Sequence, residues 1–417
     1  MCDGVNTLLL KDVRIVDADH QLVGDILIRD GSIWALGRKL PAPRGVPVLQ
    51  GEGRTALPAF VDLHAHFRDP GFPEKEDLLS GARAAAHGGF TCVSLMPNTD
   101  PVCDSPEVAR YMLERAREIG LVEVYPVGAI TVDLRGEELS PLEALAPWVW
   151  AFSDDGKGVE DHELMLRACR KAAALERTVY PHCEFGGLAD RGLSQELMVG
   201  RDLWLCRRTG CRLHLAHIST PGGLELVSLA KERGLPVSCE VTPHHLCLTR
   251  EEGDYPVNPP LPERETREAL VKALKGGTID AIATDHAPHT PPDKAAGAPG
   301  ISGIELAFSL LYTRLVAPGT ISLPELSRYL SLGPARILGL RKGLIRVGYD
   351  ADLVLFSDEE FTAGEDFFYS KSANTPLLGA RLSGRVWATL HRGEVIYLDG
   401  AVKGRDFRDH REVIRGG

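Results

Sequence analysis

Short apolar runs alternate with longer amphipathic stretches through the middle of the chain. The apolar runs cover residues 59–64, 90–96, 122–130, 149–154, 178–182, 212–217, 236–241 and 279–285. Helical spacing follows near 75–88, 106–119, 160–176, 222–233 and 263–275, and more weakly near 141–147 and 195–208. Eight strands that alternate with helices predict an α/β fold, a (β/α)8 barrel of the TIM type over residues 58–343. Residues 303–315 and 323–338 are expected to add helices that close it.

The two ends of the chain have a different pattern. Apolar and β-branched runs fill the first 57 residues, with a hairpin signal at Asp30-Gly31. Strand-like runs return at 351–356, 385–390 and 394–398. Because neither end is large enough to fold alone, residues 1–57 and 344–417 are predicted to pair into one small β-domain that flanks the barrel.

Composition narrows the class of protein. The chain has 417 residues, 44% of them hydrophobic, and a formal net charge of −11, which argues against nucleic acid or an anionic membrane as partner. Its nine cysteines are scattered without a C-x-x-C pair, as expected of reduced thiols in the cytoplasm. No apolar run is long enough to cross a membrane. These features favour a cytoplasmic protein that acts on a small molecule.

Polar side chains follow the predicted strands. His64 and His66 end the first strand, Asn98 follows the second, and Asp154 and Asp155 end the fourth. The fifth, sixth and eighth strands end at His182, His217 and Asp285. Barrels of this type build their active sites at the C-terminal strand ends. Four histidines and two aspartates there predict a zinc site of one or two ions, because imidazole and carboxylate suit zinc and a carboxylate can bridge two ions.

Other residues near these motifs receive structural or substrate-binding interpretations. Arg68, two residues beyond His66, could hold an anionic substrate. His244 and His245 follow the seventh strand and are expected to be structural or to support a ligand. Strand alternation predicts that His214 lies on the face opposite His217, and that the Cys183 thiol turns away from the ligands.

The assembled motifs resemble the amidohydrolase superfamily and, within it, the dihydroorotases. The resemblance covers essentially the whole chain. It rests on Asp62-Leu-His-Ala-His-Phe-Arg-Asp-Pro-Gly71, Met96-Pro-Asn-Thr99, Phe152-Ser-Asp-Asp-Gly156, His182-Cys-Glu184, Asn258-Pro-Pro-Leu261, Ala283-Thr-Asp-His-Ala-Pro-His289 and Ser370-Lys-Ser-Ala-Asn-Thr-Pro376. Many relatives use a carboxylated lysine after the fourth strand. Here Asp155 stands in that place, and Lys157 lies in the following loop.

The resemblance implies a role for each site residue. The metal ligands would be His64, His66, Asp155, His182, His217 and Asp285. Asp285 would also be the catalytic proton shuttle, and the substrate would be held by Arg68, Asn98, Asn258 and His289. The sequence departs from the family pattern at Ala59, at Pro262 and in a short loop after His182, which affects loop geometry rather than the ligands.

The implied activity is the reversible, metal-dependent closure of N-carbamoyl-L-aspartate to L-dihydroorotate in pyrimidine synthesis. Two alternatives remain. One is a cyclic amidase of the hydantoinase or allantoinase type. Enzymes of that type lack the combination of arginine and asparagine that this chain has at Arg68 and Asn98. The other is a non-catalytic dihydroorotase-like scaffold for aspartate transcarbamoylase, which the complete ligand set disfavours. A homo-oligomer and a complex with aspartate transcarbamoylase are the expected assemblies.

Overall fold

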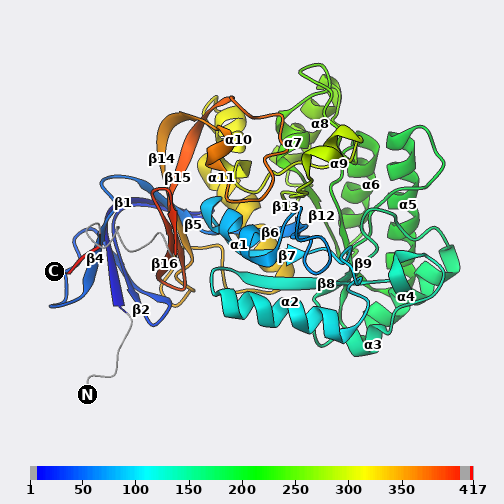
Figure 1. Ribbon diagram of the computed structural model, residues 1–417, viewed down its shortest axis with the longest axis horizontal. Coiled ribbons are helices and arrows are strands. Elements are labelled where there is room, and N and C mark those ends of the chain that lie inside the picture. The colour runs from blue at the N-terminus through cyan, green and yellow to red at the C-terminus, as the bar shows by residue number, and fades with distance from the viewer. Residues whose placement is uncertain (1–6, 404–413, 417) are drawn as a thin grey trace.

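The computed structural model describes residues 7–403 and 414–416, whose strands form two sheets that lie side by side (Figure 1). The sheet of ten strands takes its strands from both ends of the chain. It contains β1 (Thr7–Val16), β2 (Gln21–Arg29), β3 (Ser32–Gly37), β4 (Pro47–Gln50), β5 (Thr55–Pro58), β14 (Leu353–Thr362), β15 (Arg381–His391), β16 (Glu394–Leu398), β17 (Ala401–Val402) and β18 (Ile414–Gly416).

The second sheet has eight parallel strands in chain order, which confirms the predicted barrel. The strands are β6 (Phe60–Ala65), β7 (Phe90–Leu95), β8 (Glu123–Ala129), β9 (Ala151–Ser153), β10 (Thr178–Val179), β11 (Arg212–Leu215), β12 (Val237–Val241) and β13 (Ala281–Ile282). A parallel bridge between Ala65 and His286 joins the first strand to the segment that follows the last. Small apolar side chains such as Val61, Ala151 and Ala281 fill the space between the strands.

Helices surround the barrel (Figure 1). They are α1 (Leu78–His87), α2 (Pro106–Ile119), α3 (Leu142–Leu145), α4 (His162–Ala174), α5 (Arg191–Thr209), α6 (Pro221–Glu232), α7 (Pro243–Cys247), α8 (Arg264–Lys275), α9 (Pro291–Ala295), α10 (Ala307–Leu311), α11 (Leu323–Ser327) and α12 (Gly333–Leu338). Among them, α2, α4, α5 and α6 contact the strands of the barrel. Shorter turns are η1 (Val132–Leu134), η2 (Tyr312–Val316), η3 (Arg328–Leu332) and η4 (Glu365–Phe367).

Local sequence explains where several helices begin and end. Asp77 forms a capping box with Ser80 at the start of α1. Pro106 occupies the first turn of α2, and Gly120 ends that helix with a φ of 65°, a conformation that costs glycine little. The helix predicted over 303–315 begins later in the structure than expected. α10 starts at Ala307 and continues into the π-helical turn η2.

The ten-stranded sheet confirms that both chain ends build one β-domain. β5 lies between β1, which it pairs in parallel, and β14, which it pairs antiparallel. A separate apolar core, with Leu10, Ile26 and Leu390 among its members, lies against this sheet. The exact boundaries of the division, 1–57 with 344–417 and 58–343, stay a prediction, and residues 1–6, 404–413 and 417 of it lie outside the described residues.

The β-domain and the barrel share a packed interface. The Phe308 ring lies 5.1 Å from Phe60 of the barrel and 4.8 Å from Phe356 of the β-domain. Beside it, Asp352 accepts hydrogen bonds from Lys342 Nζ at 2.5 Å and from Thr91 Oγ1 at 2.9 Å. Among the described residues, no helix combines the length and the apolar character that crossing a membrane requires.

Candidate metal centre

The barrel brings six of the predicted site residues together at the C-terminal ends of its strands. All six are buried, and none is more than 9% exposed. They are His64 in β6, His66 directly after it, Asp155 after β9, His182 after β10, His217 after β11 and Asp285 after β13. Two of them have positive φ, 29° at His217 and 47° at Asp285, and non-glycine residues hold that conformation only where the surroundings enforce it.

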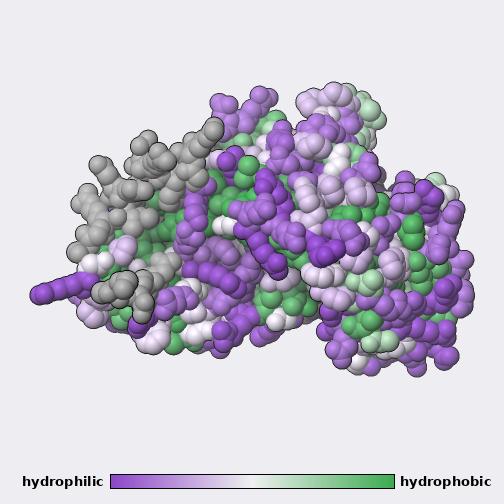
Figure 2. All heavy atoms as spheres, turned by 60° about the horizontal axis from the view of Figure 1, so that its bottom comes forward, coloured by the Kyte–Doolittle hydropathy of each residue, from purple (hydrophilic) through white to green (hydrophobic). Residues whose placement is uncertain are grey.

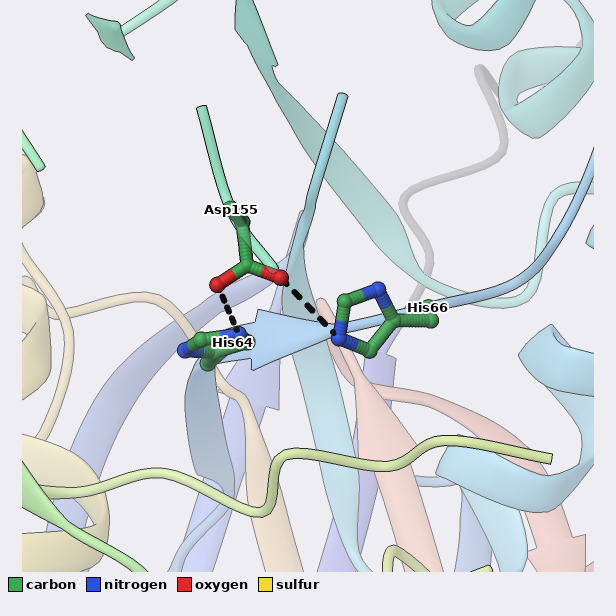
Figure 3. A group of neighbouring side chains, drawn as sticks. All are labelled: His64, His66 and Asp155. Carbon is green, nitrogen blue, oxygen red and sulfur yellow. Dashed lines mark ion pairs between the residues drawn. The ribbon is translucent and has the colours of Figure 1, made fainter. Parts of the chain in front are cut away.

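Asp155 lies at the centre of this group. Its Oδ1 is 3.4 Å from His64 Nε2, and its Oδ2 is 3.6 Å from His66 Nε2, so the carboxylate spans the two rings (Figure 3). Oδ1 also lies 3.4 Å from His182 Nδ1 and 3.9 Å from His217 Nε2. Burial would raise the pKa of Asp155, but His64 and the other histidines hold it well below its ordinary value. An ionised carboxylate between two histidine pairs can bridge two cations.

The donor atoms fit one or two metal ions. One set, His64, His66 and Asp155, and a second set, Asp155, His182 and His217, each place their ligand atoms within 4.8 Å of one another. Within the described chain, His64 Nε2, Asp155 Oδ1 and His217 Nδ1 are buried without a hydrogen-bond partner. Buried polar atoms are rarely left unpaired, so three in one cluster fit a site that binds a cation. Nitrogen and carboxylate donors without sulfur are typical of zinc in enzymes.

Asp285 approaches the first set from the segment after β13, which is bridged to the end of β6. Its Oδ1 lies 3.2 Å from His66 Nε2 and 3.6 Å from His64 Nε2. Burial would raise the pKa of Asp285, yet the charge of His64 and the hydrogen bond to His66 hold it below its ordinary value. Asp62 fixes the backbone before it by accepting bonds from Thr284 N at 2.9 Å and Thr284 Oγ1 at 2.5 Å. Asp285 is therefore an ionised, positioned group that can accept a proton.

The histidines of the first set are each held at their other nitrogen. Glu240 Oε1 lies 3.0 Å from His64 Nδ1, and Asn98 Oδ1 lies 2.9 Å from His66 Nδ1. Such contacts fix the tautomer, so that Nε2 faces the metal position. Glu240 was not among the predicted site residues. A carboxylate inside the apolar run 236–241 is nevertheless a usable signal, because a buried carboxylate without a partner is costly.

His214 also belongs to this inner layer, so its predicted orientation is wrong. Its Nε2 lies 3.1 Å from Glu240 Oε2, and its ring lies 4.7 Å from that of Tyr180, which donates to Glu240 Oε1 at 2.5 Å. The prediction assumed that side chains alternate between the two faces of a strand as far as His217. The strand β11 ends at Leu215, and His217 has a φ of 29°, so the alternation does not extend from His214 to His217.

Known proteins resemble this chain over nearly its whole length. A family model described as dihydro-orotase-like matches residues 53–204. A dihydroorotase of Clostridium botulinum is 42% identical over 395 residues, which cover 94% of this chain and 99% of that protein. The chain belongs to the dihydroorotase family. A second member, from Thermoanaerobacter, is 41% identical over 420 residues and covers 94% of this chain and 97% of its own length.

Solved structures place the dihydroorotase-family chain within a wider fold group. An L-hydantoinase (dihydropyrimidinase) from Arthrobacter aurescens superposes with a TM-score of 0.83 at 25% identity, covering 95% of this chain and 97% of its own. A D-hydantoinase (dihydropyrimidinase) from Thermus has a TM-score of 0.81 at 25% identity, with 96% and 97% covered. Together with the family relatives, these confirm the predicted fold, the dihydroorotase family and the class of cyclic-amide hydrolases.

The four predicted substrate residues of this family member lie in three places. Arg68 Nη2 donates to His289 Nε2 at 3.3 Å, and Arg68 Nε contacts Pro288 O at 3.4 Å. Burial, followed by the charge of Arg68, lowers the pKa of His289 to about 4, so the ring is neutral and can accept. Asn98 is engaged with His66. Asn258 lies near His182, where its Nδ2 donates to Glu184 Oε2 at 2.7 Å.

Three further predictions are decided by the contacts. Asp154 accepts from the backbone N–H groups of Ile130 at 2.8 Å and Thr131 at 3.0 Å, so only the second aspartate of the pair faces the histidines. Cys183 is buried with its Sγ 3.8 Å from Asp202 Oδ2, which confirms that it turns away from the ligands. His245 contacts Thr242 Oγ1 at 2.6 Å and Pro259 O at 3.0 Å, as a structural or supporting residue would.

Proposed function

We propose that this chain catalyses the reversible closure of N-carbamoyl-L-aspartate to L-dihydroorotate, a step of pyrimidine synthesis. The observation that carries the proposal is the Arg68–His289 pair, which lies beside the ionised Asp285 and the histidine cluster. Both compounds carry a carboxylate outside the reacting amide. A guanidinium offers that carboxylate two parallel hydrogen bonds, and the contact with His289 and Pro288 orients it.

One or two zinc ions are proposed as the cofactor. His64, His66, Asp155 and Asp285 would hold one ion, and Asp155, His182 and His217 would hold the other, with Asp155 as the shared ligand. When bound, zinc supplies Lewis acidity toward the amide carbonyl and lowers the pKa of water to about 7. The unpaired nitrogen and oxygen atoms of the cluster support this assignment.

The remaining steps are assigned to side chains of this chain. In the hydrolytic direction, Asp285 accepts the proton of the attacking water and delivers it to the ring nitrogen as the amide bond breaks. Arg68 and His289 hold the substrate carboxylate, so the ring enters in one orientation. Asn98 and Asn258 face the ring from the sides of His66 and His182. Ring closure follows the same path in reverse.

The test is a hydrolysis assay on protein of measured zinc content. Dihydroorotate should be turned over, hydantoin and allantoin should be much poorer, and a chelator should abolish the activity. Arg68→Lys should weaken substrate binding by about 10- to 150-fold, the equivalent of a charge-assisted bond of about 1.5–3 kcal/mol, with zinc content unchanged. Equal turnover of hydantoin would refute the substrate. No turnover of any cyclic amide, with or without aspartate transcarbamoylase, would favour the scaffold alternative.

The predicted homo-oligomer has a candidate surface on α5 and α6. Leu193, Leu197 and Trp204 follow one stripe of α5 with 45%, 48% and 59% exposure, and Leu229 of α6 beside them is 40% exposed. Figure 2 shows hydrophobic atoms exposed on the side where Figure 1 places these helices. Gly200 lies within the stripe. A Cβ there would meet only Leu226 Cδ1, at 3.8 Å, so this chain's own packing does not require glycine in mid-helix.

We propose that a second copy packs antiparallel against this stripe. Glu196 lies toward the start of α5, and Arg207 and Arg208 lie at its end, so an antiparallel pair brings opposite charges together. Trp204→Glu should shift the protein toward the monomer in light scattering. The matched control is Trp34→Glu, because Trp34 is 58% exposed and, like Trp204, lies under an arginine at 5.1 Å. An unchanged mass for the Trp204 variant would refute the surface.

The expected protein partner and the expected cellular location stay predictions. Association with aspartate transcarbamoylase is tested by co-elution of the two purified proteins on size exclusion. A cytoplasmic location is tested by cell fractionation.

A further inference from the structure

The segment between β14 and β15 contacts the loop that carries the proposed substrate residues. Asn374, in the motif 370–376, lies 85 residues beyond His289 in the chain. Its Oδ1 accepts a hydrogen bond from the backbone N of His289 at 3.0 Å. The same Oδ1 accepts from Ser302 Oγ at 2.6 Å. Ser372 Oγ lies 2.5 Å from the carbonyl oxygen of His289. Residue 289 is therefore held at both its N–H and its C=O by the β-domain segment.

The amide nitrogen of Asn374 completes this arrangement. Its Nδ2 donates to Gly300 O at 3.0 Å and to Ala287 O at 3.3 Å. One side chain thus joins two runs, 287–289 and 300–302, which also pair through Ala287 N and Ile301 O at 2.8 Å. At Gly300, with φ at 143°, a Cβ would lie 2.7 Å from Ala287 Cβ, so the two runs are packed closely at this point.

The loop held by Asn374 in turn holds Arg68. Pro288 O lies 3.4 Å from Arg68 Nε, and His289 Nε2 lies 3.3 Å from Arg68 Nη2. These contacts fix the plane and direction of the guanidinium. Arg68 itself has a φ of 58°, a conformation that needs support from its surroundings. The metal-site histidines His64 and His66, by contrast, are hydrogen-bonded at their other nitrogen by Glu240 and Asn98, which belong to the barrel and not to the 370–374 segment.

We infer that Asn374 is a positioning residue for substrate specificity. It sets the loop 287–289, and through it the orientation of Arg68 and His289, toward the carboxylate of the ring substrate. The inference rests on the proposed function, since it deepens the role given there to Arg68 and His289. Asn374 acts on the half of the site that binds the carboxylate and leaves the metal half unchanged.

The test combines binding, kinetics and a double-mutant cycle. Asn374→Ala should raise the KM for dihydroorotate and the Kd for orotate, a planar ring with the same carboxylate, by roughly 10- to 100-fold. The kcat and zinc content should stay within about threefold of the parent. In the Arg68→Lys background, Asn374→Ala should add a clearly smaller factor than in the parent, because the guanidinium that it positions is gone and only His289 is left to misplace. Asn374→Asp enters the same cycle if the alanine variant does not fold.

A matched control comes from the same segment. Lys371 contacts Pro73 O and Asp77 and does not touch the loop 287–303, so Lys371→Met should leave both KM and Kd unchanged. Additive effects of the Arg68 and Asn374 changes, or a loss of kcat and zinc together with a constant KM, would overturn the inference. A parent that binds orotate but hydrolyses no dihydroorotate would refute the proposed function alone, since the orotate cycle still measures the role of Asn374.

Discussion

Replacing Glu240 with glutamine should weaken zinc binding although none of the proposed ligands changes. Glu240 is fully buried and accepts at one oxygen from His64 Nδ1 and Tyr180, and at the other from His214 Nε2. Burial alone would raise the pKa of Glu240, but the bonds from His214 and His64 lower it to about 2. Glutamine has the same shape, yet it has no charge and only one accepting oxygen.

The size of the effect follows from the contact that is lost. A hydrogen bond to a charged group contributes about 1.5–3 kcal/mol, and Glu240 is fully buried. With about 1.4 kcal/mol for each factor of ten, that is roughly 10- to 150-fold, in line with the 10- to 100-fold typical of groups that orient metal-bound histidines. The amide NH₂ also forces either His64 or His214 to act as acceptor. If His64 changes tautomer, its proton moves to the nitrogen that faces the metal.

Zinc affinity is measured by competition with a chelator at constant pH, for the parent, Glu240→Gln and Tyr180→Phe. The tyrosine variant is the control, because it removes one hydrogen bond to Glu240 but keeps the carboxylate charge, and its affinity should fall far less. Circular dichroism of the zinc-free proteins checks that the fold is retained. A Glu240→Gln affinity within about threefold of the parent, or a larger loss in Tyr180→Phe, would refute the reasoning.

Four further variants test other parts of the molecule. Asp285→Asn should lower the hydrolysis rate by about 10²- to 10⁴-fold with most zinc retained, whereas Asp155→Asn should lose zinc, as metal analysis of both proteins would show. Lys342→Met should lower the free energy of unfolding by about 3–5 kcal/mol, because Asp352 stays buried without its cation. Phe308→Ala should cost about 3–5 kcal/mol in denaturant unfolding with zinc content unchanged.

The Lys342 pair also predicts a pH dependence. Burial would raise the pKa of Asp352, but His391 and Lys342 hold it below its ordinary value in the folded protein. Because the folded pKa is depressed, the stabilisation is fully present above the unfolded value of about 4 and is lost as pH falls below it. Unfolding measured from pH 6 to pH 3 should therefore show a smaller acid loss in Lys342→Met than in the parent. An equal loss in both proteins would assign the acid sensitivity to other groups.

Much of the fold could be predicted because its signals are local. Alternating apolar and amphipathic runs mark each strand and helix, and barrel topology carries the residue after each strand to one end. That is why His64, His182 and Asp285, more than a hundred residues apart along the chain, could be placed together. The substrate side was harder. The substrate role of Asn98 stays a prediction, and its contact with His66 was not foreseen because that pairing depends on side-chain direction rather than on spacing.

Features set by tertiary contacts escaped the sequence analysis. His214 was assigned to the wrong face because the backbone turns at His217, and periodicity says nothing about where a strand stops alternating. Glu240 and Tyr180 were missed because each lies inside an apolar run and their partners come from other strands. Asn374 stood in a recognised motif, but its contacts with residues 287–302 follow only from how the β-domain lies against the barrel.

The position of β5 between β1 and β14 has a consequence for synthesis. A ribosome completes β5 roughly 300 residues before it reaches β14, a delay of about 15–60 s at 5–20 residues per second. During that interval the growing chain carries an open strand edge, the kind of surface that recruits other chains. The residues of the barrel are therefore synthesised, and can begin to fold, while β5 still lacks its neighbouring strand β14. Aggregation of ribosome-bound chains that end between β13 and β14 should exceed that of chains extended past β15.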